Sequence, residues 1–161
     1  MAQDDADTRK ILAFLERIGI PVLFETVEGD TFLPAMTVRG GALVVDPARL
    51  TWPGDLLHEA GHIAVTDPAL RPTLDAVSPD GGEEMAAIAW SYAASVEIGI
   101  DAAVVFHAEG YRGAGDSLAE NFTAGRYFGD PMLHYCGMTV MARHAAEQGV
   151  PPYPHMLRWL R

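Results

Sequence analysis

The stretch of residues 55–64, which reads DLLHEAGHIA, constrains the fold of this chain more than any other. The Asp67-Pro68 pair that follows is typical of a helix end, so we expect a helix over residues 56–65. Two histidines and a glutamate stand in this helix among leucine, isoleucine and alanine. The small pair Ala60-Gly61 allows another element to lie close to it. The pattern therefore predicts an interior helix that is covered by a further element.

The spacing of the polar residues in this helix indicates a metal site. His58 and His62 are four residues apart, which places both imidazoles on one helix face, within reach of one tetrahedral ion. Glu59 stands beside that ion, where it can act as a general base on water. This is the HExxH pattern of zinc peptidases, so we expect one zinc ion and a zinc-dependent hydrolase that acts on a protein or peptide. The alternative is a zinc-stabilised binding or regulatory module that uses the same cleft without catalysis.

Zinc in a hydrolytic site takes a third protein ligand and keeps one position open. In one class of HExxH enzymes a histidine six residues after the motif supplies this ligand, but Pro68 stands there. The other source is a glutamate at the start of the next helix, which Glu83 and Glu84 open. We favour Glu84, because mostly small residues follow it at helical spacing and form a face that can pack against the motif helix. Glu83 is the alternative ligand.

The expected elements make an α+β fold in a single domain of 161 residues. Helices are expected over residues 7–18, 56–65, 83–98, 102–108, 117–126 and 132–148. Strands over residues 21–27, 31–38 and 42–45 form a small antiparallel meander packed with the motif helix, and Gly40-Gly41 makes its tight turn. The minimal core spans residues 8–98, and a helical extension spans residues 101–161.

Composition argues against two classes of partner. Acidic residues outnumber basic ones 22 to 11, and a net charge of −11 without a basic run argues against nucleic acid. The longest apolar-leaning stretch, residues 85–105, is interrupted by polar residues, so no contact with a membrane is expected. The single cysteine, Cys136, and the acidic start of the chain favour a cytoplasmic protein. These patterns leave the oligomeric state open.

The order of these elements resembles that of a known family. It is similar to the minimal gluzincin domain of the ImmA/IrrE metallopeptidases. The shared order is a helix, a short meander, the HExxH helix and then a helix that opens with Glu84-Met85-Ala86-Ala87. The resemblance covers about residues 8–98 and is that of a divergent member. It implies a zincin-like fold in which His58, His62 and Glu84 bind zinc and Glu59 is the general base. It also implies a regulatory protein as the substrate class.

An electrophilic tyrosine or histidine usually supports the oxyanion in such sites. The candidates in this chain are Tyr92, His107, Tyr111 and His134, and spacing selects none of them. We retain His107 and Tyr111 as candidate oxyanion stabilisers. His107 is preferred, because it lies just after the second long helix.

Overall fold

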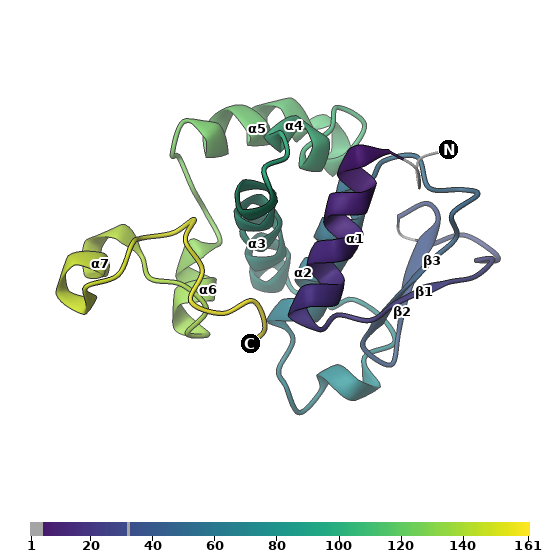
Figure 1. The fold of residues 1–161 in the computed structure, drawn as a ribbon, viewed down its shortest axis with the longest axis horizontal. Helices are drawn as coiled ribbons and strands as arrows, with labels where there is room; N and C mark the ends of the chain where they lie inside the picture. Colours follow the sequence, from purple (N-terminus) through teal and green to yellow (C-terminus); the bar gives the residue numbers. More distant parts are fainter. Residues whose placement is uncertain (1–4, 32) are drawn as a thin grey trace.

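A small sheet lies against a group of helices in the structure, a computed structural model that describes residues 5–31 and 33–161 (Figure 1). The chain forms a mixed α+β domain, as the sequence predicts. The described residues contain helices and strands in the order α1 (Ala6–Ile18), β1 (Val22–Phe24), β2 (Met36–Arg39), β3 (Ala42–Val45), α2 (Gly54–Val65), α3 (Gly81–Ile98), α4 (Ala102–Val105), α5 (Gly115–Thr123), α6 (Asp130–Tyr135) and α7 (Ala142–Gln148). Two short 3₁₀ turns, η2 (Arg71–Thr73) and η3 (Tyr111–Gly113), lie between helices.

The sheet is mixed, so the predicted antiparallel meander is wrong. Its strand order is β1-β3-β2, and only β2 and β3 form the expected hairpin, with positive φ at Gly40 and Gly41. Strand β1 lies parallel to β3. The Asp46 carboxylate, just after β3, accepts a hydrogen bond from the Val27 amide and so holds the matching ends of the parallel strands together. Both strands are shorter than the predicted 21–27 and 31–38, since β1 ends at Phe24 and β2 begins only at Met36. Residue 32 of the second predicted strand lies outside the described residues.

The approach of α3 to α2 decides the geometry of the predicted site. Helix α2 is buried along its whole length, and α3 packs directly against it. A Cβ atom on Gly61 of α2 would lie 2.9 Å from the Ala87 carbonyl oxygen of α3, a contact that requires glycine. Both His58 and Glu84 lie three residues before this contact. This close contact therefore lies within about one turn of His58 on α2 and of Glu84 on α3.

Side chains hold the C-terminal end of α2, those of Thr66 and Arg161 at the His62 and Val65 carbonyls and that of Arg71 at several more. The guanidinium of Arg71 donates hydrogen bonds to the carbonyl oxygens of Ile63 and Thr66, both at 3.1 Å, and of Arg161 at 2.7 Å. The last carbonyls of a helix have no partner within the helix, so Arg71 supplies what the local backbone cannot. This contact joins the motif helix to the end of the described chain, where Trp159 packs edge-on against Phe14.

The C-terminal part departs from its predicted helices. The helix expected over residues 132–148 is divided into α6 and α7, because the backbone between them pairs with a later segment. Thr139 forms a β-bridge with Met156, and the Met138 carbonyl accepts the Leu157 amide at 2.8 Å. Gly137, with φ of 71°, turns the chain out of α6. Helix α7 projects from the body of the molecule (Figure 1).

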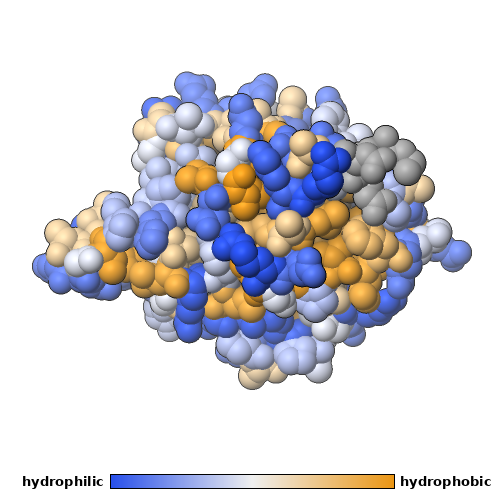
Figure 2. All heavy atoms as spheres, viewed as in Figure 1, coloured by the Kyte–Doolittle hydropathy of each residue, from blue (hydrophilic) through white to orange (hydrophobic). Residues whose placement is uncertain are grey.

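Apolar side chains are also exposed on one face of the molecule. Figure 2 shows them gathered over the sheet, beside charged residues. Leu23 and Phe24 of β1 are 41% and 47% exposed.

Among the described residues, no helix has the length and apolar character needed to span a bilayer.

Candidate metal centre

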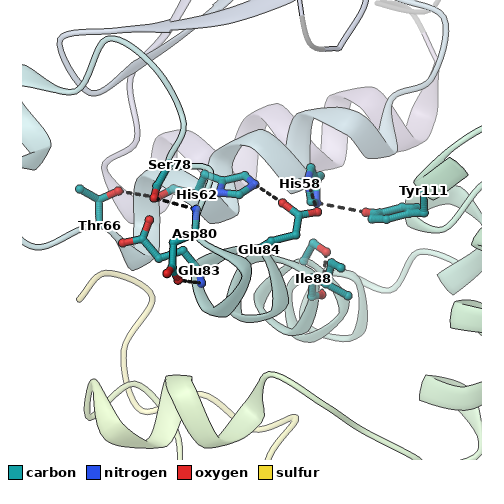
Figure 3. Close-up of polar contacts among 10 residues, drawn as sticks. His58, His62, Thr66, Ser78, Asp80, Glu83, Glu84, Ile88 and Tyr111 are labelled. Carbon is teal, nitrogen blue, oxygen red and sulfur yellow. Dashed lines mark hydrogen bonds and ion pairs between the residues drawn. The ribbon is translucent and has the colours of Figure 1, made fainter.

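Three side chains from α2 and α3 bring metal-binding atoms together. Nε2 of His58 lies 3.3 Å from Oε1 of Glu84, and Nε2 of His62 lies 2.8 Å from Oε2 of the same carboxylate. Figure 3 shows the carboxylate between the two imidazoles. Two ligand atoms that are each about 2.0 Å from a tetrahedral zinc ion lie about 3.3 Å apart, so these spacings suit one ion. The group can hold a metal ion.

The hydrogen bonding of His62 also fits a metal ligand. Its side chain is buried, yet neither ring nitrogen has a hydrogen-bond partner among the described residues. The Glu84 carboxylate is near Nε2 but outside hydrogen-bond geometry. A buried polar atom without a partner is costly, and a metal ion that accepts the lone pair of Nε2 removes that cost at this nitrogen.

Of the two candidate glutamates, the structure places Glu84 at the imidazoles. Burial alone raises the pKa of Glu84, but the adjacent His58 and His62 outweigh it and hold that pKa well below its usual range. Glu84 is therefore a carboxylate, the form that binds a cation. The Glu83 side chain points away from the imidazoles (Figure 3). The backbone amide of Glu83 donates a hydrogen bond of 2.9 Å to the carboxylate of Asp80, which caps the helix.

Glu59 is buried beside the metal-binding group. Its side chain is 4% exposed, and its Oε1 has no hydrogen-bond partner among the described residues. Burial raises the pKa of Glu59, an effect that the nearby His62 and His58 partly offset. A carboxylate with a raised pKa holds a proton more firmly, as a general base must.

Tyr111 reaches His58 from a loop far along the chain. Its hydroxyl oxygen lies 3.2 Å from Nδ1 of His58, on the far side of the ring from Glu84 (Figure 3). If His58 carries its proton on Nδ1 and donates it to this oxygen, Nε2 keeps a free lone pair for a metal. Tyr111 and Arg112 both have positive φ, 55° and 56°, which is strained for residues with a Cβ. The loop is therefore held in the conformation that brings Tyr111 to His58.

Replacing Tyr111 by Phe is expected to weaken zinc binding about 10- to 100-fold, the usual effect of losing a partner that orients a ligand. The measurement is zinc competition against a chromophoric chelator. The control is Tyr153→Phe, because the Tyr153 hydroxyl is also buried and bonded, at 2.7 Å, but to the Ala89 carbonyl and not to a candidate ligand. The control loses stability and keeps its zinc affinity. Equal zinc affinities in the two variants would mean that Tyr111 does not position His58.

A second buried pair lies at the start of α2. Nε2 of His107 lies 2.8 Å from Oδ1 of Asp55, and the ring of Trp52 stacks on His107 with centroids 4.5 Å apart. Burial raises the pKa of Asp55, and the imidazole of His107 partly offsets this. Nδ1 of His107 has no partner among the described residues. His107 is thus fixed in orientation and keeps one nitrogen for another contact.

The partners Asp55 and Trp52, and the contact of Tyr111 with His58, were not predicted from the sequence. Asp55 carried a usable signal, since it lies three residues before His58 and four before Glu59 and therefore shares their helix face. Tyr111 carried none, because its contact joins residues 53 positions apart through a strained loop.

A cleft of about 1330 Å³ opens beside these groups. Strand β2 and residues 75–79 line it, as do the loop of His107 and Tyr111 and the face of α2 that carries His58 and Glu59. The candidate base and two of the three candidate ligands, His58 and Glu84, therefore border the cleft.

Comparison of the chain with protein-family models, with curated proteins and with solved structures finds no match. No family is thereby shown. The function must be inferred from the side chains and the cleft they line.

Proposed function

We propose that this protein is a zinc-dependent hydrolase of the gluzincin type that cleaves peptide bonds, on a zincin-like fold. The supporting observation is the convergence of His58, His62 and Glu84, whose donor atoms lie within 4.8 Å of one another, beside the buried carboxylate of Glu59. Two histidines and one carboxylate are a ligand set of catalytic zinc sites, which keep a position open for water or substrate. All of these ligands come from the rigid pair α2 and α3.

The groups of the chain divide the chemistry among them. Zinc bound there supplies a Lewis acid that lowers the pKa of water to about 7 and polarises the substrate carbonyl. Glu59, which borders the cleft, takes the proton of the attacking water and passes it to the leaving nitrogen. His107, oriented by Asp55 and Trp52, stays the predicted donor to the developing oxyanion, a role that requires its proton on Nδ1, while Tyr111 orients His58.

The open edge of β2 supports a peptide as the substrate. The Ala35 carbonyl accepts a hydrogen bond from the Asp46 amide. In an antiparallel pair every second residue bonds to the neighbouring strand, so Thr37 bonds to β3. The N–H and C=O of Val38 therefore face away from β3. Thr37 and Val38 line the cleft. An extended peptide can bond to this edge as an added strand. A regulatory protein as the source of that peptide, which the family resemblance implies, stays a prediction.

Metal content tests the first half of the proposal. The purified protein is expected to contain about one equivalent of zinc by mass spectrometry, because its donors suit one ion. Stripping this zinc with a chelator is expected to lower the melting temperature by about 10 °C. A ligand at about a thousand times its Kd adds about 4 kcal/mol to the free energy of unfolding, which corresponds to a shift of that size in a domain of this length. Returning zinc restores the melting temperature. A protein that neither contains nor binds a divalent metal contradicts the proposal.

Hydrolysis tests the second half. A library of internally quenched peptides is expected to contain sequences that the zinc-loaded protein cuts and the stripped protein does not. Cleavage that persists after stripping points to a contaminating protease. A protein that binds zinc but cuts no member of the library is the non-catalytic binding module.

A further inference from the structure

We infer that the peptide segment held in the cleft is basic and carries lysine or arginine side chains near the bond that faces Glu59. This inference rests on the proposed function, since it names the substrate class of the same site. The observations that carry it are the charges that line the cleft and the buried polar atoms that lack partners there.

Carboxylates dominate the lining of the cleft. Six of them belong to Asp30, Asp55, Glu59, Asp75, Glu84 and Glu109. Arg112 is the one guanidinium among the described residues that line it. A bound divalent cation offsets two of these charges, and the cleft stays negative. A cleft of one sign raises the local concentration of ligands of the opposite sign.

Three of these carboxylates lie outside the metal centre and are exposed, namely those of Asp30, Asp75 and Glu109. The Oδ1 atom of Asp75 accepts the Gly40 amide at 2.8 Å, which fixes this carboxylate just beyond the end of β2. Arg39, at that end of the strand, is held by Glu25 through two hydrogen bonds of 2.7 and 2.9 Å. Asp75 is thus held in the lining of the cleft, where its carboxylate adds to the negative charge.

Acidic residues on a surface are common, so buried polar atoms decide whether this cleft takes a ligand. Oε1 of Glu59 and Nδ1 of His107 lack partners among the described residues, and both residues are more than nine-tenths buried and line the cleft. Buried polar atoms without partners are costly, which favours a ligand that supplies partners at this end of the cleft. The outward-facing N–H and C=O of Val38 add a backbone requirement that an extended peptide meets.

The test is peptide binding to the zinc-loaded Glu59→Gln protein, which holds a peptide without cutting it. The probes are two fluorescein-labelled peptides of alanine, threonine and valine that differ only in three positions, lysine in one and glutamate in the other. By fluorescence anisotropy the lysine peptide is expected to bind about tenfold more tightly than the glutamate peptide. Three exposed ion pairs together contribute about this much to the affinity. The preference is expected to shrink in about 0.5 M NaCl, where exposed charges are screened.

Two triple variants in the Glu59→Gln background separate the cleft from the overall charge of −11. Asp30→Asn, Asp75→Asn and Glu109→Gln together remove the exposed cleft carboxylates, and Asn at position 75 can still accept the Gly40 amide. This variant is expected to lose the preference for lysine. The control, Asp116→Asn, Glu120→Gln and Glu147→Gln, makes the same change of charge at exposed positions outside the cleft and keeps the preference.

Several results overturn the inference. They are equal binding of the two peptides, tighter binding of the glutamate peptide, no binding of either, and a preference that both triple variants keep or both lose. Zinc-dependent hydrolysis of neutral and acidic peptides without a basic preference overturns the inference and leaves the proposed function standing. A lysine preference in a protein that hydrolyses nothing overturns the proposed function alone.

Discussion

The Glu59→Gln protein is expected to bind zinc and to lose the proposed peptidase activity. Glutamine matches glutamate in size, so it fits the same buried position on α2. Its amide, however, cannot take a proton from water. A general base contributes about 10²- to 10⁴-fold to a rate, so kcat/KM is expected to fall by about 10³-fold. The measurements are kcat/KM with a quenched peptide and zinc content by mass spectrometry.

The matched control for this variant is Glu120→Gln, which makes the same chemical change at an exposed position of α5. Its activity and zinc content are expected to equal those of the unaltered protein. Activity within tenfold of normal in Glu59→Gln would remove Glu59 from the role of base. Loss of zinc in the same variant would instead mark Glu59 as a ligand.

The second large effect is expected at the third ligand. Replacing Glu84 by Ala is expected to weaken zinc binding about 10²- to 10³-fold, because each of four zinc ligands accounts for about 3 to 4 kcal/mol of a typical zinc-binding free energy. Peptidase activity is expected to fall with the zinc occupancy. Competition with a chromophoric chelator measures the affinity directly.

Glu83→Ala is the control for this prediction, since it removes a neighbouring glutamate from the same first turn of α3. Its carboxylate points away from the imidazoles, so zinc affinity is expected to change little (Figure 3). Only the stability of the helix start is expected to fall, by about 0.3 to 1 kcal/mol, through the lost interaction with the helix dipole. The reverse order of zinc affinities would make Glu83 the ligand.

The helix that carries the site was predictable, because its signals are local. Spacing of four residues puts His58 and His62 on one face wherever the helix lies, and residues 56–65 lie within the observed α2. The hairpin turn at Gly40-Gly41 was predictable for the same reason, since its positive φ values belong to the turn itself. Each of these features depends on residues only a few positions apart.

The pairing of β1 was not predictable in this way. The lengths of the strands and their turn residues are the same whether β1 joins an antiparallel meander or lies parallel to β3. Which pairing forms depends on contacts made by residues beyond the strand ends. Here the Asp46 carboxylate reaches the Val27 amide 19 positions earlier. The division of the helix expected over residues 132–148 has a similar cause, since a segment beyond it occupies the backbone at Thr139.

The sequence by itself determined the HExxH helix, its two histidines, the adjacent glutamate and a short choice of partners. Only the tertiary structure placed Glu84, and not Glu83, beside the two imidazoles, because successive residues of a helix point about 100° apart and the rotation of α3 about its axis depends on its contact with Gly61. It also brought Tyr111 to His58, and Asp55 to His107 across 52 positions. Helical periodicity orders side chains along one element, whereas a metal centre needs atoms from several elements at one point, and packing alone sets those distances.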